Sequence, residues 1–223
     1  MPRIDRIEIL DRQLVSRDDR FLKLETLRVR NHYADGTVSR DYHCDFVLAP
    51  GIDAVAVILY YREAERVFVG VTECVRPACY LRGQLPLVQP DARGYRTVTE
   101  IVAGRFEPLD AGEGGIDRRA AAEAREEAGF AVDPAAAIPL GQALFTSPGQ
   151  SPEKVHFRAF EIDPAARQPA PGDGSPMELG HPMRFLELAD AIRRCVGGDI
   201  EDTKTEIGFR RLADHLAHAT RDA

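Results

Sequence analysis

Residues 100–130 constrain the fold of this chain more than any other segment. A short apolar run leads into Ala103-Gly104, and an acidic, glycine-rich loop follows it. An alanine-rich stretch comes next and predicts a helix that begins near Asp117, a residue suited to capping a helix N-terminus. Gly129 is suited to ending the same helix. The sequence therefore predicts a strand, a loop and a helix joined in one unit.

Three glutamates of this predicted helix, Glu123, Glu126 and Glu127, fall on one face, because positions i, i+3 and i+4 of an α-helix are neighbours. Their mutual repulsion destabilises the helix unless a cation binds. Carboxylate oxygens suit Mg²⁺ or Mn²⁺, and these ions suit chemistry on phosphates. The alternative is a solvated acidic face that holds no ligand.

The same segment resembles the Nudix box, whose pattern is Gly-x5-Glu-x7-Arg-Glu-apolar-x-Glu-Glu-x-Gly-apolar. Gly104 and Glu113 match its first half in residue type but not in spacing, because the loop is four residues longer than the pattern. A loop can lengthen at little cost, since the entropy of loop closure grows slowly with length. Ala122 stands at the arginine position of the box. The second half is matched by Glu123, Ala124, Glu126, Glu127, Gly129 and Phe130.

Four segments, in the order that the family shows them, resemble the ADP-ribose pyrophosphatase branch of the Nudix family over residues 20–220. The branch has a Gln/Glu-x-x-Arg segment and then Glu-apolar-apolar-Ala-Gly before the box. It continues with a Ser-Pro-Gly-x-x-x-Glu loop and, near the C-terminus, Gly-x-Ile-x-Asp-x-Lys-Thr. The matching segments here are residues 73–76, 100–104, 147–153 and 198–205.

The resemblance implies a hydrolase that cleaves the pyrophosphate bond of a nucleoside diphosphate-sugar. ADP-ribose is the favoured substrate, with AMP and ribose 5-phosphate as products, although the sequence does not rank it against other ADP-sugars, GDP-mannose or UDP-glucose. The implied cofactor is Mg²⁺, with Mn²⁺ as the alternative. Its implied ligands are Glu123, Glu126 and Glu127 with the carbonyl of Ala103, and catalysis is expected to depend on Glu127.

The resemblance also implies residues that contact the substrate. Arg76 and Glu100 match residues near the nucleotide, and Glu153 matches one that approaches the substrate. Glu178 is the candidate general base that takes a proton from the attacking water, and His181 in the same loop is the alternative. Ordinary roles stay open: a surface ion pair for Arg76, a strand-end charge for Glu100 and a loop glutamate for Glu178.

Residues 5–50 alternate apolar and polar positions in three runs, which predicts a small antiparallel β-sheet within residues 1–50. A turn of Ala-Asp-Gly at residues 34–36 lies between two of these runs and favours a hairpin. So few strands are not stable alone and need a covering surface. The resemblance implies a homodimer whose N-terminal sheets help to form the site, and we expect residues 1–50 to serve in dimerisation.

Residues 51–223 are predicted to form the Nudix hydrolase domain. Strands and helices alternate without a strict βαβ rhythm, which predicts an α/β fold with a mixed sheet between helices. The resemblance implies that this fold is a Nudix-type α/β/α sandwich. Strands are expected at residues 52–61, 66–74, 138–146 and 154–162, and helices at residues 186–194 and 202–219.

The chain of 223 residues has a formal net charge of −7 and no long basic run, which argues against nucleic acid or an anionic membrane as a partner. No stretch is apolar enough to span a membrane, and the N-terminus lacks the apolar core of a signal peptide. Four cysteines without a Cys-x-x-Cys pair indicate reduced thiols and a cytoplasmic location.

Ala122 and the longer loop leave two functions open: a metal-dependent hydrolase, and a Nudix-fold module that binds or senses nucleotide-sugars with weak or no turnover. The complete set of box glutamates favours the hydrolase. Arg119 lies one turn before Glu123, and Arg118 lies one turn before Ala122. We predict that Arg119, or otherwise Arg118, orients the box glutamates in place of the missing arginine. The alternative is that both arginines face solvent.

Overall fold

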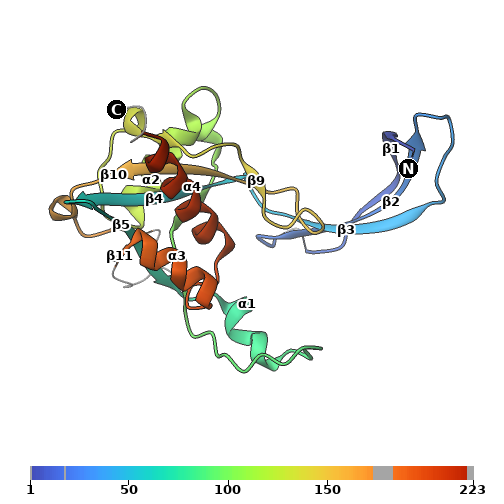
Figure 1. Cartoon of the computed structure of the whole chain (residues 1–223). Helices are drawn as coiled ribbons and strands as arrows, with labels where there is room; N and C mark the ends of the chain where they lie inside the picture. Colours follow the sequence, from blue (N-terminus) through green and yellow to red (C-terminus); the bar gives the residue numbers. More distant parts are fainter. Residues whose placement is uncertain (1, 18, 173–182, 220–223) are drawn as a thin grey trace. The chain divides into compact units, whose positions relative to one another are not determined.

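The computed structural model describes residues 2–17, 19–172 and 183–219, and the chain divides into two compact units (Figure 1). The N-terminal unit comprises Met1–Asp53 together with Phe145–Lys154. The main unit comprises Ala54–Leu144 and Val155–Ala223. The segment 145–154 therefore belongs to the N-terminal unit, although its neighbours in sequence are strands of the main unit.

Three antiparallel strands form the sheet of the N-terminal unit: β1 (Ile4–Leu14), β2 (Lys23–Tyr33) and β3 (Tyr42–Leu48). β2 lies between the other two. The turn at residues 34–36 is present, and Gly36 has a φ of 84°, which glycine adopts without strain. The predicted small antiparallel sheet is confirmed.

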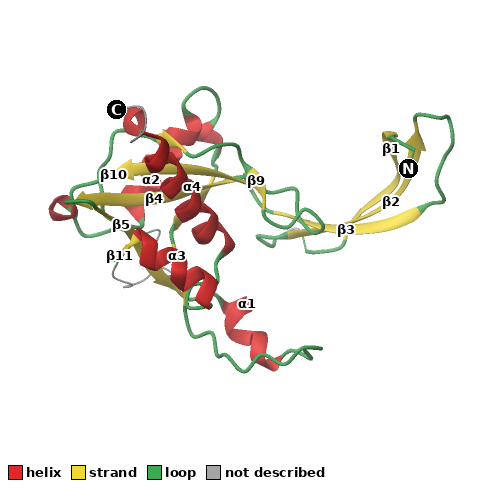
Figure 2. Ribbon diagram, in the orientation of Figure 1, coloured by secondary structure: helices red, strands yellow, loops and turns green. Residues whose placement is uncertain are grey.

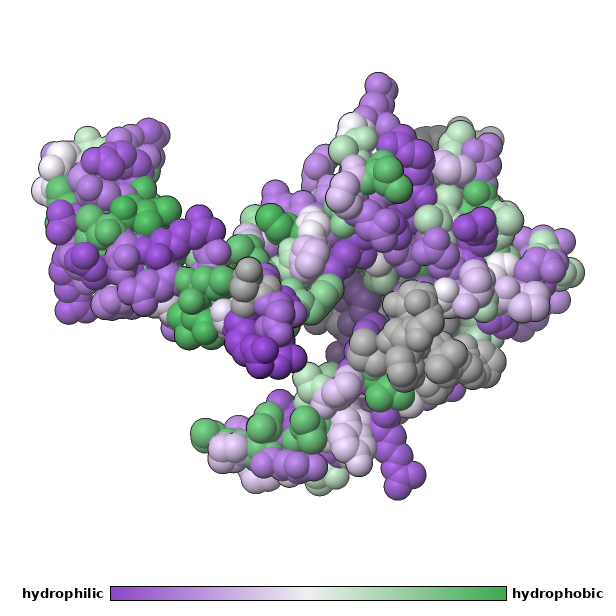
Figure 3. All heavy atoms as spheres, turned by 180° about the vertical axis from the view of Figure 1, so that it is seen from behind, coloured by the Kyte–Doolittle hydropathy of each residue, from purple (hydrophilic) through white to green (hydrophobic). Residues whose placement is uncertain are grey.

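Alternation along the strands gives this sheet two different faces. The register places Ile9 opposite Val29 and Val29 opposite Tyr42, so these side chains share one apolar face. Ile7 and Ile9 are 56% and 57% exposed, and Figure 3 shows apolar side chains on the surface of this unit. The apolar face is therefore only partly covered by the described chain.

The sheet of the main unit has the strand order β11-β5-β4-β10-β8, with β6 on β5, β7 on β4 and β9 on β10. β4 runs parallel to β10 and antiparallel to β5 and β7, so the predicted mixed sheet is confirmed. Its strands are β4 (Ala54–Glu63), β5 (Arg66–Cys74), β6 (Val98–Glu100), β7 (Val102–Arg105), β8 (Ile138–Pro139), β9 (Leu144–Phe145), β10 (Lys154–Glu161) and β11 (Arg184–Glu187).

Helices cover both faces of this sheet (Figure 2). Successive side chains of β4 point to opposite faces, so Val55, Val57 and Leu59 pack with the alanines of α2 (Gly115–Glu126). Ile58 and Tyr60 pack on the other side with α3 (Leu188–Gly197) and α4 (Thr203–Ala219). The predicted three-layer arrangement is confirmed. The short helices are α1 (Pro77–Tyr80), η1 (Leu81–Gln84), η2 (Pro108–Asp110), η3 (Pro134–Ala136) and η4 (Pro164–Ala166).

Two predicted helix starts were wrong. α2 begins at Gly115, with Gly114 as its N-cap in the left-handed conformation at φ 71°, so Asp117 lies inside the first turn. The carboxylate of Asp117 forms an ion pair with Arg158 and does not cap the helix. α3 begins at Leu188, later than predicted, because residues 184–187 pair with β5 as the edge strand β11.

β6 and β7 form one extended segment that changes partner midway. β6 pairs with β5 up to Glu100, and β7 pairs with β4 from Val102 onward. Ile101 lies between the two strands and outside both pairings. The predicted strand before the box therefore consists of two short strands that meet at this crossing.

The described residues contain no helix that is both long enough and apolar enough to cross a membrane. The four cysteines, Cys44, Cys74, Cys79 and Cys195, are free thiols.

Candidate active site

The strand–loop–helix unit holds a nearly buried arginine among carboxylates. Arg119 donates from Nε to Asp110 Oδ2 at 3.0 Å and from Nη1 to Glu123 Oε1 at 3.1 Å. Its Nη2 lies 2.9 Å from Glu107 Oε2, and its Nη1 lies 3.9 Å from Glu126 Oε2. We call these five residues the Arg119 cluster. Burial alone would lower the pKa of Arg119, but the hydrogen bond to Asp110 and the charge of Glu123 raise it above its ordinary value.

The lengthened loop supplies two carboxylates of this cluster and is packed onto the start of α2. Glu107 donates its backbone N–H to Asp110 Oδ2 at 2.7 Å, which folds the loop around η2. A Cβ atom on Gly115 would lie 1.6 Å from the carbonyl oxygen of Asp110, so the contact requires glycine. The insertion is thus a structured part of the site.

The two candidate arginines have different partners. Arg119 contacts Glu123 and Glu126, as predicted for a residue that orients the box glutamates. Arg118 donates instead to backbone carbonyls of the loop, those of Glu113 at 2.8 Å and Ala111 at 3.4 Å. The predicted contact of Arg119 with the box is confirmed, and its effect on metal binding and turnover stays a prediction.

Two box glutamates meet β7 at Ala103-Gly104. Glu123 is 7% exposed, and a Cβ atom on Gly104 would lie 1.6 Å from its Oε1, so only glycine leaves room for this carboxylate. Glu127 Oε2 accepts a hydrogen bond from the backbone N–H of Ala103 at 3.3 Å. The middle of β7 and the C-terminal part of α2 are therefore joined through the carboxylates themselves.

These oxygen donors have the chemistry of a magnesium or manganese site. Among the residues that the structure describes, no group of three or more histidine, cysteine, aspartate or glutamate side chains is gathered closely enough to hold a metal ion. Glu123 faces Arg119, and Glu127 faces the N–H of Ala103. Metal binding by the box glutamates and the Ala103 carbonyl therefore stays a prediction, supported by the donor types and by the excess of carboxylates over arginine.

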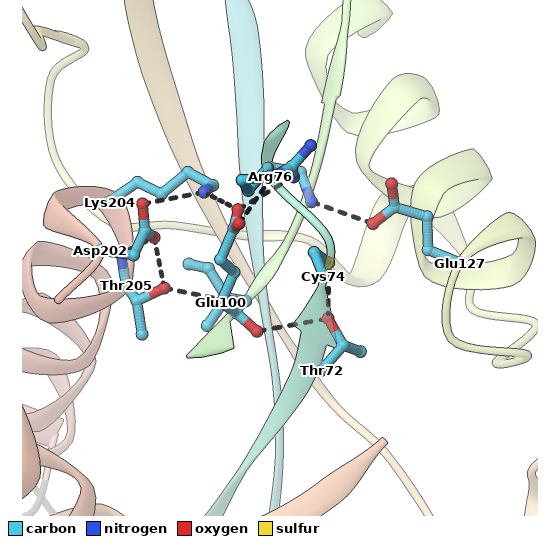
Figure 4. A network of polar contacts seen from close by, with 10 residues as sticks. Thr72, Cys74, Arg76, Glu100, Glu127, Asp202, Lys204 and Thr205 are labelled. Atoms are coloured by element: carbon cyan, nitrogen blue, oxygen red, sulfur yellow. Dashed lines mark hydrogen bonds and ion pairs between the residues drawn. The ribbon is translucent and has the colours of Figure 1, made fainter. Parts of the chain in front are cut away.

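A second network of charges surrounds Glu100 (Figure 4). Glu100 accepts hydrogen bonds from Arg76 Nε at 2.6 Å and Nη2 at 3.0 Å, and it forms an ion pair with Lys204. Lys204 Nζ also lies 3.0 Å from Asp202 Oδ1. We call these four residues the Glu100 cluster. Its central carboxylate, Glu100, is 3% exposed.

Glu100, Lys204 and Arg76 each have a pKa shifted toward the charged form. Burial by itself would raise the pKa of Glu100, but the hydrogen bonds from Arg76 and the charge of Lys204 hold it below its ordinary value. Burial would likewise lower the pKa of Lys204, but Asp202 and Glu100 raise it. The hydrogen bond to Glu100 raises the pKa of Arg76. Two cations therefore balance two carboxylates.

The start of α4 fixes the crossing between β6 and β7. Asp202 Oδ2 accepts from the backbone N–H of Thr205 at 2.9 Å, as a helix cap does. Thr205 Oγ1 in turn accepts from the backbone N–H of Ile101 at 2.9 Å. The sequence matched Lys204 and Thr205 to a family segment but gave them no role. The Asp-x-x-Thr spacing at the start of the predicted helix could have indicated this capping contact.

The remaining predicted site residues are less closely grouped. Arg76 and Glu100 lie together in the main unit, and the Arg76 side chain is 43% exposed beyond its contact with Glu100. Glu153 belongs to the N-terminal unit, where its backbone N–H donates to Ser151 Oγ at 3.2 Å. Glu178 and His181 lie outside the described residues.

No protein-family model matches the sequence, and no curated protein matches it. Among solved structures, an ADP compounds hydrolase is similar at 13% identity, with a TM-score of 0.65 and 98% of each chain covered. A C. elegans Ap4A hydrolase, solved as a binary complex, shares 15% identity over 75% of this chain and 98% of its own, with a TM-score of 0.48. The NUDIX domain of Shewanella oneidensis NrtR, complexed with ADP ribose, shares 9% identity over 74% of this chain and 88% of its own, with a TM-score of 0.49.

The similarity to the ADP compounds hydrolase spans almost the whole of both chains, and the fold assignment rests on it alone. Both predicted parts of the architecture, the mixed sheet between helices and the small antiparallel sheet, are present. The chain therefore has the fold of the Nudix domain proteins.

Proposed function

We propose that this protein hydrolyses the pyrophosphate bond of a nucleoside diphosphate-sugar, with ADP-ribose as the first candidate and AMP and ribose 5-phosphate as its products. The observation that carries the proposal is the Arg119 cluster, in which carboxylates outnumber the arginine beside Ala103-Gly104. A site with such an excess of negative charge is suited to a divalent cation. The ADP compounds hydrolase with the same fold supports this reaction class.

Mg²⁺ or Mn²⁺, held by Glu123, Glu126 and Glu127 with the Ala103 carbonyl, would neutralise the diphosphate and lower the pKa of a bound water. The protein's own residues position these ligands. Arg119 fixes the Glu123 carboxylate through Nη1, and the absence of a side chain at Gly104 lets that carboxylate reach the strand. The N–H of Ala103 fixes Glu127.

Arg76 is the proposed binding residue for the diphosphate. Its Nε and Nη2 are engaged by Glu100, which fixes the plane of the guanidinium. Because the side chain is 43% exposed, its outer edge remains open to solvent and can donate to phosphate oxygens. Glu100 thus acts through Arg76, as a positioning residue. Glu153 as a substrate contact and Glu178 as the general base complete the proposal.

We also propose a homodimer that covers the apolar face of the N-terminal sheet. Ile7 and Ile9 are each more than half exposed on that face, and a three-stranded sheet needs a covering surface. A second copy of the chain presents the same apolar face and can pair with it. Sedimentation at micromolar concentration should give a dimer, and Ile7→Glu with Ile9→Glu should give a monomer. Gln13→Glu, on the polar face, is the matched control; a monomeric parent chain would contradict the proposal.

A substrate panel tests the function. ADP-ribose, other ADP-sugars, GDP-mannose and UDP-glucose are incubated with the protein and Mg²⁺ or Mn²⁺, and the monophosphate products are measured after phosphatase treatment. Turnover of at least one compound that stops on chelation of the metal supports the hydrolase. Tight binding without turnover would support the alternative, a module that binds or senses nucleotide-sugars. That alternative draws its support from Ala122 at the arginine position of the box.

A further inference from the structure

A pocket of about 630 Å³ lies in the main unit, beside the Glu100 cluster but lined by other residues. Its walls come from the segment that follows α1, from the β6 strand and from the link between α3 and α4. Four arginines line it: Arg82, Arg93, Arg96 and Arg184. Three carboxylates, Glu73, Asp199 and Glu201, line it as well, so the arginines that are not held by a carboxylate decide what the pocket can bind.

The four arginines differ in how firmly they are held. Arg82 donates to Asp91 at 2.8 Å, and Arg184 lies 2.9 Å from Glu73. Arg93 has only long contacts, 3.4 Å to a carboxylate oxygen of Glu201 and 3.4 Å to a backbone carbonyl. Within the part of the chain that the structure describes, no hydrogen bond or ion pair is found for the exposed side chain of Arg96. Arg96 is therefore open to a ligand, and Arg93 is held only loosely by its present contacts.

Asp91 organises the wall that carries these two arginines. Its carboxylate accepts hydrogen bonds from Arg82, from the backbone N–H of Arg93 at 3.1 Å and from the hydroxyl of Tyr95 at 3.0 Å. The Arg93 guanidinium lies over the ring of Tyr95, 5.7 Å from its centroid. Burial and the hydrogen bond to Asp91 raise the pKa of Tyr95 to about 12, so this lining residue stays neutral. The wall has a defined structure and presents an aromatic ring beside the charges.

The chemistry of the pocket favours one class of ligand. A phosphate monoester carries about two negative charges at neutral pH, which matches the two loosely held guanidinium groups. Arginine also binds phosphate oxygens in a two-pronged geometry. A pocket of about 630 Å³ is larger than inorganic phosphate requires. Its volume falls within the range of about 300–1,000 Å³ found for small-molecule sites. The ring of Tyr95 offers a surface for a base or a sugar.

We propose that this pocket binds the phosphate monoester of a nucleoside or a sugar through Arg93 and Arg96. The proposal rests on the proposed function only for the source of the ligand, because both products of ADP-ribose hydrolysis are phosphate monoesters. Such a pocket holds a product close to the Glu100 cluster without using its residues. Binding there is independent of the metal.

Titration calorimetry on the full chain in EDTA tests the proposal, with AMP, ribose 5-phosphate and inorganic phosphate as separate ligands. The parent chain should bind AMP or ribose 5-phosphate with a Kd of about 1 mM or tighter, and inorganic phosphate more weakly. The double change Arg93→Ala with Arg96→Ala should weaken that binding at least about tenfold, as loss of two charged contacts predicts. Arg193→Ala removes an exposed arginine of α3 outside the pocket and should change the Kd less than about twofold.

Arg76→Ala separates this pocket from the proposed active site and should leave the binding in place. The proposal is overturned if the parent chain binds neither organic phosphate, or if the double variant binds as the parent does. It is also overturned if Arg76→Ala abolishes binding, or if inorganic phosphate binds as tightly as the organic ligands. If the protein hydrolyses a substrate but the double variant binds as the parent does, only this inference fails. If the pocket binds an organic phosphate but no substrate is hydrolysed, only the proposed function fails. Melting temperatures confirm that each variant is folded.

Discussion

In the Glu100 cluster two cations share two carboxylates, whereas in the Arg119 cluster one arginine lies among the carboxylates of four residues. Both clusters contain a nearly buried glutamate, with Glu100 3% exposed and Glu123 7% exposed. Their burial is thus alike and their charge balance is not. The Glu100 cluster needs no further charge, while the Arg119 cluster has an excess of negative charge that a divalent cation would offset.

The comparison teaches that burial alone does not identify a reactive carboxylate. A buried glutamate that is fully paired, such as Glu100, fixes its neighbours and has little left to offer a ligand. Glu123 shares the Arg119 guanidinium with three other carboxylates, and such crowding of negative charge favours the binding of a further cation. The following predictions test this distinction.

Arg119→Ala should have the largest effect, because it removes the cation of the Arg119 cluster and leaves several carboxylates facing one another. The free energy of unfolding should fall by about 3 kcal/mol, as for loss of one partner from a buried ion pair. Metal affinity or turnover should fall roughly ten- to hundredfold, as is typical when a residue that orients metal ligands is lost. Denaturant unfolding and metal titration measure the two effects. Arg118→Ala is the control, and equal losses in both variants would contradict the orienting role.

Glu127→Gln should abolish most activity and leave the fold in place. The change keeps the shape of the side chain and removes one proposed ligand charge, so turnover should fall at least about 100-fold, or about 2.7 kcal/mol of barrier. Glu206→Gln, which neutralises an exposed carboxylate paired with Arg210 on α4, should keep parental activity. Turnover of Glu127→Gln within about threefold of the parent chain would remove Glu127 from the proposed site.

Lys204→Met should have a smaller effect, because Glu100 keeps its two hydrogen bonds from Arg76. We expect a loss of about 1–2 kcal/mol in the free energy of unfolding, as for a buried polar group that loses one partner. KM should rise more than kcat falls, since the change acts through the position of Arg76. Arg210→Met on the same helix should cost less than about 0.5 kcal/mol. A stability for Lys204→Met equal to that of this control would show that the Glu100 cluster is not balanced as proposed.

The smallest effect is expected from pH. The pKa of Glu100 is lowered in the folded state from its ordinary value of 4.5. Its contribution to stability is therefore present above that value and is lost as pH falls through the lowered pKa. The difference in unfolding free energy between the parent chain and Glu100→Gln should be constant from neutral pH down to about pH 5. Below about pH 5, this difference should shrink by at most about 1.4 kcal/mol per pH unit. A difference that grows as the pH falls would show that the pKa of Glu100 is not lowered in the folded state.

Much of the fold could be predicted, because its signals are local. The strand at residues 66–74 was predicted with the bounds that the structure gives, because a short charged turn separates it from the nearly continuous apolar run of residues 52–61. The start of α2 was not, because it depends on the close contact between Gly115 and the Asp110 carbonyl, which periodicity does not reveal. Asp117 was predicted as a helix cap from its residue type. Its actual partner, Arg158, lies 41 residues later in the sequence, where no local pattern points to it.

The candidate site could be predicted only in part, for the same reason. The three box glutamates follow from helical spacing, and the contact between Arg119 and Glu123 follows from a separation of four residues. Asp110 and Glu107 come from an insertion without periodic pattern. Lys204 approaches Glu100 across 104 residues of sequence, and no local rule predicts such a pair.

The hydrogen bond between Thr205 and the N–H of Ile101 has a consequence for the order in which the chain can fold. It joins residues 104 positions apart, so the crossing between β6 and β7 gains this partner only when α4 has been synthesised. Contacts of such high sequence separation form slowly, because a long loop must close first. A nascent chain that has been synthesised only as far as α3 already carries every box glutamate. The crossing between β6 and β7 still lacks its hydrogen bond to Thr205. The proposed active site is therefore among the last features of the main unit to form. A chain arrested before α4 should carry all of its box carboxylates and lack the proposed hydrolase activity.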